Sequence, residues 1–363
     1  MRVLFDAYWW SSGPRSNASV QRGIIHTWAE AFPEDELAIA VRGNEIQVEG
    51  NAGGLDSRFD VQRTYSPLQA LTNGIEVPRI ARRWGADAVV AHNFAPRLRS
   101  GVSAVFVHDF LFLDHPGWFT PIENVYFRRM RTMARHADVI ATSSESEARR
   151  IKTHLGRTVS AIGLANSPTL MAAVPVSPFR SPPQTFLLAV ARLNLRKNLN
   201  NIVEAAMLSG VVSPKFPLIV VGESSGKVDH IDAVSAAAAG SVVFLGNVSD
   251  GELRWLYERA SLFLHLSLGE GFGLPGIEAL AFGTPILASD IPVFRETLRG
   301  SATFVDPLDV HSVAKHIASV RSGVGMSPGE GAFRRGLDLV RRSGYSWSAM
   351  VDKLRSDLLA AGA

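Results

Sequence analysis

The chain has 363 residues, 46% of them hydrophobic and 20% charged, and a formal net charge of +3. This length predicts two domains, and the composition is typical of a soluble globular protein. The small net charge does not by itself point to nucleic acid, and we expect no such partner. The absence of cysteine excludes disulfides and thiolate metal sites. No apolar run predicts a spanning helix, and the first residues read as a strand and a polar loop, not as a signal peptide.

The first half of the chain alternates apolar runs with helical patterns. Val20, Ile24 and Trp28 recur at helical spacing and predict a helix over 18–32. A helix is also predicted over 67–84, with a break or kink at Pro78. Strands are predicted over 2–8, 37–41, 87–92, 103–109, 138–142 and 159–163, and further helices over 122–136 and 145–155. The alternation predicts a parallel sheet with helices on both faces.

A proline-rich segment separates the two halves. Residues 174–183 include Pro175, Pro178, Pro182 and Pro183, so they are predicted to form an extended linker. Beyond the linker we predict strands over 185–191, 218–222, 242–245, 262–266, 285–288 and 303–305. Helices are predicted over 198–208, 229–239, 250–260 (with Asp250 as its cap), 311–321 and 347–358.

The most informative stretch is 267–290, where an apolar strand leads into a glycine loop and a helix. Glu270 lies among glycines, Pro275 suits the first turn of a helix, and Gly283 suits its end. Glu278 is placed in the first turn of that helix. A strand, glycine loop and helix N-terminus favour phosphate binding, and the two acids would hold polar groups beside the phosphate, such as sugar hydroxyls. The alternative is an ordinary turn with two solvated glutamates.

This stretch resembles the E-x7-E signature of the retaining glycosyltransferases of GT-B fold, family 4, also called glycosyl transferases group 1. Glu270 and Glu278 have that spacing, and Gly-Phe-Gly-Leu-Pro follows Glu270. The resemblance implies an α/β fold of two Rossmann-like, doubly wound domains facing across a cleft. We expect an acceptor-side domain over 1–173, packed with a C-terminal helix at 345–363, a linker over 174–183, and a donor-binding domain over 184–344.

The resemblance also implies roles for residues of the second domain. Arg192 and Lys197 follow its first strand and match the family's conserved cations, which would stabilise the departing diphosphate. Arg196 is the neighbouring cation that we do not select, and a solvated basic loop is the alternative. Glu270 and the loop residues Gly271, Phe272, Gly273 and Leu274 would hold the sugar. Glu278 would hold the nucleotide ribose.

In the first domain, His108-Asp109 ends a predicted strand and resembles the family's His-Asp segment. His108 would bind a donor-sugar hydroxyl and Asp109 would orient the imidazole, although such a pair is often only structural. The loop over 11–19 departs from the family's glycine turn, so a phosphate contact there would come from Arg15, Ser16, Asn17 or the backbone. Ser143 and Ser144 are interpreted mainly as a helix cap, with Glu147 reinforcing the first turn.

The resulting interpretation is a retaining, metal-independent hexosyltransferase. It would move a sugar, with mannose slightly favoured, from a GDP- or UDP-sugar to a hydroxyl of a glycan, a lipid-linked saccharide or a small molecule. No cofactor and no metal are expected, and the sequence contains no Asp-x-Asp motif. The alternatives are a non-catalytic nucleotide-sugar-binding protein and a GT-B sugar-nucleotide epimerase.

Basic residues cluster over 122–157, a stretch that contains eight basic and four acidic residues. Enzymes with lipid-linked acceptors often bind anionic membranes through such a face. We therefore expect a cytoplasmic protein with an optional peripheral contact at the inner face of the membrane. The alternative is a pair of solvated helix faces.

Overall fold

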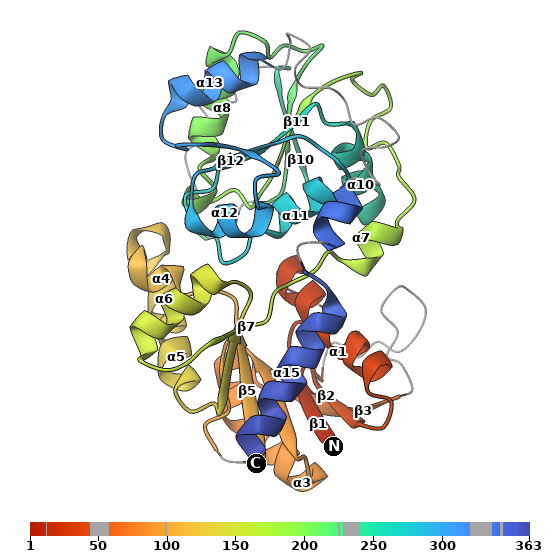
Figure 1. Ribbon diagram of the computed structural model, residues 1–363, viewed down its shortest axis with the longest axis vertical. Coiled ribbons are helices and arrows are strands. Elements are labelled where there is room, and N and C mark those ends of the chain that lie inside the picture. The colour runs from red at the N-terminus through yellow and green to blue at the C-terminus, as the bar shows by residue number, and fades with distance from the viewer. Residues whose placement is uncertain are drawn as a thin grey trace. The chain divides into compact units, whose positions relative to one another are not determined.

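A computed structural model describes residues 1–11, 13–43, 58–98, 100–223, 226–227, 240–319, 336–341 and 344–363. The chain divides into two compact units. The first unit comprises Met1–Asp114, Pro121–Leu164 and Ser346–Ala363, and the second comprises His115–Thr120 and Ala165–Tyr345. Figure 1 shows that each unit contains a sheet with its own helices.

The first unit is built on a parallel sheet of seven strands in the order β3-β2-β1-β4-β5-β6-β7. The strands are β1 (Arg2–Asp6), β2 (Glu36–Arg42), β3 (Phe59–Thr64), β4 (Ala88–His92), β5 (Val102–Val107), β6 (Val139–Thr142) and β7 (Ser160–Ala161). The strand order reverses between β1 and β4, and ligands of open parallel sheets bind beyond the carboxyl ends of strands at such a point.

Helices cover both faces of this sheet. They are α1 (Arg15–Ala31), α2 (Gln69–Leu71), the π-helix η1 (Thr72–Glu76), α3 (Val77–Trp84), α4 (Leu111–Asp114), α5 (Pro121–Ala134), α6 (Glu145–Leu155) and α15 (Trp347–Gly362). On β1, Leu4 packs in one cluster with Val77 and Ile80 of α3. The next residue, Phe5, points to the opposite face and contacts Trp28 of α1, with ring centroids 5.4 Å apart.

The second unit has a sheet of six strands in the order β10-β9-β8-β11-β12-β13. The strands are β8 (Leu187–Val190), β9 (Leu218–Val221), β10 (Val242–Gly246), β11 (Leu262–His265), β12 (Ile286–Ser289) and β13 (Thr303–Val305), and all their pairings are parallel. The helical segments are η2 (Pro116–Trp118), α7 (Pro168–Ala172), η3 (Leu195–Lys197), α8 (Leu199–Leu208), α10 (Asp250–Arg259), α11 (Leu274–Ala281), α12 (Pro292–Leu298) and α13 (Val310–Ser319).

The core of the second unit also has two layers of helix around the sheet. Leu187 and Leu264 of the sheet pack in one cluster with Ile202 of α8 and Ile317 of α13. On the opposite face, Phe186 stacks on Trp255 of α10 at a centroid distance of 5.8 Å. The buried strands are short apolar runs, as parallel strands covered on both faces require.

Several predicted boundaries are wrong. The N-terminal part of the first unit ends at Leu164 rather than at residue 173, because α7 packs in the second unit. Thr169 donates to Asp250 at 2.6 Å, and Arg254 donates to the carbonyls of Met171 and Ala173 at 2.9 Å. The helix predicted over 229–239 lies outside the described residues.

Local details also differ from the prediction. Pro78 lies in the first turn of α3, directly after the π-helix η1, so the helical segment changes type where a break or kink was predicted. The predicted 67–84 helix is instead α2, η1 and α3 in succession. Ser249, not Asp250, caps α10, and it forms a capping box with Glu252.

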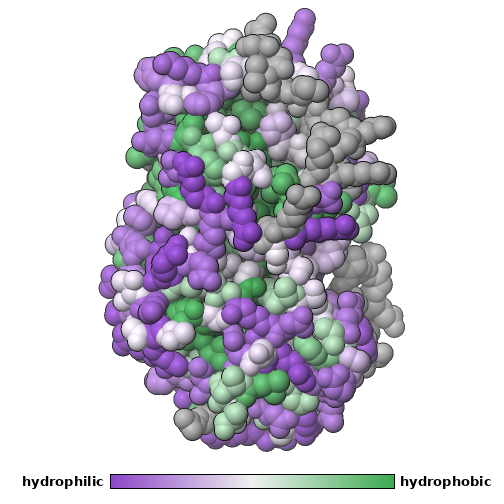
Figure 2. All heavy atoms as spheres, viewed as in Figure 1, coloured by the Kyte–Doolittle hydropathy of each residue, from purple (hydrophilic) through white to green (hydrophobic). Residues whose placement is uncertain are grey.

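Among the described residues, no helix is long and apolar enough to cross a membrane. On the face shown in Figure 2, apolar side chains are scattered among polar ones. On α5, however, Ile122 and Val125 are 83% and 62% exposed.

Candidate active site

The glycine loop lies between β11 and α11 in the second unit. Gly273 caps α11 with φ 88°, and a Cβ there would lie 2.5 Å from Cε1 of Phe294. Both the left-handed backbone and the close approach therefore require glycine. Pro275 occupies the first turn, as predicted, but Glu278 lies beyond it, since the first turn of α11 contains no acid.

The carboxylate of Glu270 is buried and forms an ion pair with Lys197. Lys197 Nζ donates to Glu270 Oε1, and Ser267 Oγ donates to the same oxygen at 2.8 Å. Arg196, which the sequence analysis set aside, lies 3.7 Å from Glu270 Oε2. The backbone connects the two loops as well, because Leu268 N–H donates to the Arg196 carbonyl at 2.8 Å. The structure thus joins a predicted sugar-binding acid directly to a predicted phosphate-binding cation.

The neighbouring cations Lys197 and Arg196 keep the Glu270 carboxylate ionised at neutral pH. Burial raises the pKa of Glu270, but Lys197 and Arg196 outweigh that effect and hold the pKa at about 2. Burial lowers the pKa of Lys197, and Glu270 partly offsets this effect. Pairing with a carboxylate offsets part of the cost of burying the ammonium group.

Asn198 positions Lys197, and sequence reasoning did not identify it. Its backbone is left-handed, with φ 59°, where η3 gives way to α8. Its side-chain amide donates to the carbonyls of Leu266 at 3.1 Å and Pro307 at 2.9 Å. Asn198 therefore fastens the loop that carries Lys197 to the end of β11. The only sequence signal was an asparagine directly before a helix.

Arg192 follows β8 on a loop that main-chain contacts position. Ala191 N–H donates to the Val221 carbonyl and Leu193 N–H donates to the Glu223 carbonyl, both at 2.9 Å. The loop can approach β9 this closely because residue 222 is glycine: a Cβ there would lie 1.9 Å from the Ala191 oxygen. Arg192 is exposed, and its charge contributes to the lowered pKa of Lys197.

Glu278 has a different environment from Glu270. Tyr257 of α10 donates its hydroxyl to Glu278 Oε2 at 2.9 Å. The carboxyl is partly exposed, yet burial raises its pKa to about 7, against the opposing effect of Tyr257. Thus one acid of the motif is ionised and the other is close to half-protonated at neutral pH. Tyr257 was not predicted as a site residue, because its position resembled that of any apolar residue of the helix.

His265 at the end of β11 also lies in this site. It is 3% exposed, and its Nε2 has no hydrogen-bond partner among the described residues. Nε2 lies 3.1 Å from where a Cβ of Gly273 would be, so the imidazole underlies the glycine loop. Burial lowers its pKa to about 3, so the ring is neutral. The signal in the sequence was a histidine at the end of an otherwise apolar strand.

In the first unit, His108 and Asp109 directly follow β5. His108 N–H donates to Asn93 Oδ1 at 3.4 Å, and its ring packs edge-on against Phe106 with centroids 5.1 Å apart. Asp109 Oδ1 accepts from Leu111 N–H at 3.3 Å. His92, at the end of β4, places its buried ring 6.0 Å from that of His108. His92 is a site candidate that the sequence analysis missed.

A buried carboxylate, Asp6, organises the carboxyl ends of β1 and β4. It accepts from Asn73 Nδ2 at 2.7 Å, Gln69 Nε2 at 2.9 Å, Tyr8 N–H at 2.9 Å and His92 N–H at 3.2 Å. Burial raises its pKa, and these donors oppose the effect. Asp6 was also missed, since it resembled any polar residue ending a strand.

Asn17 is not in a loop as predicted. It lies in the first turn of α1, which begins at Arg15, and its N–H donates to the Pro14 carbonyl at 2.9 Å. Pro14 takes the N-cap position, and a proline there fixes the backbone angle φ. Among the described residues, no group of three His, Asp or Glu side chains is arranged to hold a metal ion.

Comparisons with known proteins identify similar chains. Residues 176–323 match the family model described as "Glycosyl transferases group 1". The O-antigen chain mannosyltransferase RfbU of Salmonella typhimurium is 29% identical over 252 residues, which are 67% of each chain. GDP-mannose:cellobiosyl-diphosphopolyprenol alpha-mannosyltransferase of Komagataeibacter xylinus is 25% identical over 318 residues, 78% of each chain.

Solved structures show the same fold. The structure of sucrose-phosphate synthase from Thermosynechococcus elongatus matches with a TM-score of 0.75 and 18% identity, and the match covers 99% of both chains. The predicted fold class is confirmed: the chain has the two parallel, Rossmann-like sheets of GT-B glycosyltransferases. The predicted family resemblance is confirmed as well. The comparisons support a glycosyltransferase, and residues 176–323 match the glycosyl transferases group 1 model.

Proposed function

We propose that this protein is a retaining mannosyltransferase that uses a nucleotide-diphosphate donor and needs no metal ion. The observation that carries the proposal is the buried Lys197–Glu270 pair beside the glycine loop, within the residues that match the family model. Mannose is favoured because the relatives from Salmonella typhimurium and Komagataeibacter xylinus bear mannosyltransferase names. GDP-mannose is the first donor to test, and UDP-sugars are the comparison.

In this proposal the second unit binds the donor. Arg192 and Lys197 neutralise the diphosphate as the sugar bond breaks, without a metal ion. Glu270 and the backbone of Gly271, Phe272, Gly273 and Leu274 hold the sugar, and Glu278 holds the ribose. The ionised state of Glu270 supports its role, because a carboxylate accepts hydrogen bonds from two hydroxyls.

The first unit supplies the remaining groups. His108 binds a sugar hydroxyl, Asp109 supports it, and Asn17 contributes a polar side chain at the start of α1. The acceptor is a hydroxyl of a glycan or lipid-linked saccharide. The relative from Komagataeibacter xylinus, whose name specifies a diphosphopolyprenol-linked acceptor, supports this class.

A panel of GDP- and UDP-sugars tests the activity through release of nucleoside diphosphate. We expect release from GDP-mannose in the presence of a saccharide acceptor, with unchanged turnover after EDTA treatment. NMR of the product gives the anomeric configuration, which we expect to match that of the donor. Tight binding of one donor without release would instead support the nucleotide-sugar-binding alternative.

Peripheral binding to the inner face of the cytoplasmic membrane is a separate part of the proposal. The exposed Ile122 and Val125 lie on the same helix as the exposed Arg128, Arg129 and Arg131, a combination that suits an anionic bilayer. Not all of the basic residues over 122–157 are available to bind lipid headgroups, since Arg150 pairs with Asp114 and Glu147.

Co-sedimentation with vesicles tests this part. We expect binding to anionic vesicles at low salt, weaker binding at high salt, and a further loss in Ile122→Ser. No binding to anionic vesicles at low salt would end the membrane proposal and leave the transfer activity untouched.

A further inference from the structure

Glu147 is a buried carboxylate that the proposed mechanism does not use. It lies in the first turn of α6, where Ser144 caps the helix by accepting from Glu147 N–H at 3.1 Å. Its side chain is fully buried. Sequence analysis interpreted it as a reinforcement of the helix start, but the structure gives its carboxylate another set of partners.

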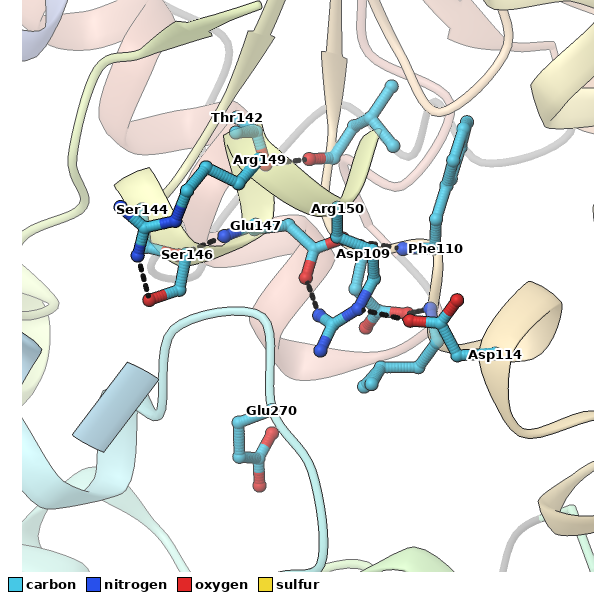
Figure 3. A network of polar contacts seen from close by, with 12 residues as sticks. Asp109, Phe110, Asp114, Thr142, Ser144, Ser146, Glu147, Arg149, Arg150 and Glu270 are labelled. Carbon is cyan, nitrogen blue, oxygen red and sulfur yellow. Dashed lines mark hydrogen bonds and ion pairs between the residues drawn. The ribbon is translucent and has the colours of Figure 1, made fainter. Parts of the chain in front are cut away.

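The Glu147 carboxylate contacts the segment that carries His108 and Asp109. Its Oε1 accepts from Phe110 N–H at 2.8 Å, and Phe110 directly follows Asp109. Its Oε2 accepts from Arg150 on the next turn of α6 (Figure 3). Burial and the nearby Asp109 charge raise the pKa of Glu147 to about 8, although Arg150 opposes them.

The far end of the same segment is also tied to α6. Arg150 Nε donates to Asp114 Oδ2 at 2.7 Å, and His154 Nε2 lies 2.7 Å from Asp114 Oδ1. The segment 110–114 is therefore held at both ends by three side chains of α6, namely Glu147, Arg150 and His154. Figure 3 shows Glu147 and Arg150 with Asp114. This arrangement fixes the main chain that leaves His108.

Stability alone gives a poor reason for this arrangement. A buried network of polar and charged side chains is often no more stabilising than apolar side chains of similar size. What this network does provide is fixed hydrogen bonds at Phe110 and Asp114. Displacing a substrate-binding group by about 1 Å can lower a rate by about 100-fold. We propose that Glu147 is a positioning residue, which fixes the positions of His108 and Asp109 through its hydrogen bond with the Phe110 N–H. This inference rests on the proposed function.

A double-mutant cycle with His108 tests the proposal. The variants are Glu147→Ala, His108→Ala and the double variant, with Glu145→Gln, exposed on the same helix, as the matched control. We expect Glu147→Ala to lower kcat roughly 10- to 100-fold with a smaller change in KM. In the His108→Ala background the same substitution should cost less than about twofold, because the residue being positioned is already gone. Glu147→Gln, which keeps an acceptor for Phe110 N–H, should recover most of the activity.

Thermal unfolding of every variant separates positioning from folding. If Glu147→Ala does not fold, Asp114→Ala, at the more exposed end of the network, is the substitute variant. We expect it to lower kcat roughly tenfold. In the His108→Ala background the same substitution should cause little further loss. Wild-type kcat in a folded variant, or a loss that adds fully to that of His108→Ala, would overturn the inference alone. A wild-type protein that releases no nucleoside diphosphate from any donor would remove the proposed function, and this inference with it.

Discussion

Lys197 and Glu270 are 73 residues apart in the chain, yet they form one buried ion pair. In this pair each group supplies an opposite charge, which offsets part of the cost of burying the other. In the proposed mechanism, it also places the ammonium before any donor arrives. Preorganised charge of this kind needs no rearrangement when the leaving group develops its negative charge.

Replacement of Lys197 by alanine is expected to lower turnover at least about 100-fold, because one charge-stabilising group at the diphosphate is lost. The measurement is the rate of nucleoside-diphosphate release at saturating donor. Lys215→Ala, an exposed lysine of the same unit, is the matched control and should leave the rate unchanged. Wild-type turnover in the Lys197 variant would exclude this lysine from the site.

The raised pKa of Glu278 predicts that the stability of the protein depends on pH. Its native pKa of about 7 exceeds the value of about 4.3 expected in the unfolded chain, so the native state holds the proton more tightly. Its contribution is fully present below pH ~4.3 and is lost as the pH rises through about 7. Glu278→Gln cannot ionise, so its melting temperature relative to wild type should be higher at pH 8 than at pH 5. An identical difference at both pH values would contradict the assignment.

At the scale of elements, α15 completes the first unit by packing against α1 and β5 (Figure 1). The two helices approach closely at Gly23, where a Cβ would lie 2.5 Å from Cη2 of Trp347. Arg355 of α15 adds an ion pair to Asp35 at 3.0 Å. The contact therefore depends on the absence of a side chain at one position of α1.

Gly23→Ala tests this contact. Alanine should gain about 0.5–1 kcal/mol in helix propensity, but overpacking against the indole should cost about 1–3 kcal/mol. We expect a net loss of roughly 1 kcal/mol in the free energy of unfolding, measured with urea. In a Trp347→Ala background the sign should reverse, because only the propensity gain remains. Destabilisation of equal size in both backgrounds would argue against the contact.

The sequence predicted elements better than the contacts between them. The strand Leu262–His265 and the helix after it could be recognised because a short apolar run, glycines and Pro275 are local signals. Phe59–Thr64 was missed as a strand, since its alternating polar residues lie at the edge of the sheet. The Lys197–Glu270 pair, the Asn198 bonds and the Asp6 cluster depend on side chains from distant segments, and no local pattern specifies such partners.

At the scale of the whole molecule, the first unit is discontinuous in sequence. Its sheet is formed by the first 164 residues, but α15 comes from the end of the chain and buries Met350, Val351, Leu354 and Leu358. At about 1.5–3 kcal/mol for each buried side chain, the helix contributes up to roughly 6–12 kcal/mol. That is comparable with the whole stability of a typical domain, about 5–15 kcal/mol.

A fragment of residues 1–164 is therefore expected not to unfold cooperatively on its own. Addition of a peptide spanning 346–363 should restore a cooperative urea transition, followed by circular dichroism. A peptide with serine at the four buried positions is the control and should have no effect. Cooperative unfolding of the fragment without the peptide would show that α15 is dispensable for this unit.

The same discontinuity sets an order of events during synthesis on the ribosome. Residues 165–345 are translated before the helix that completes the first unit, so the second unit is fully synthesised while the first is still incomplete. Domains usually fold in the order in which they emerge, N-terminal first. In this protein the order of completion is reversed, and the face of the first sheet that α15 covers stays open to chaperones until the last residues of α15 have left the exit tunnel.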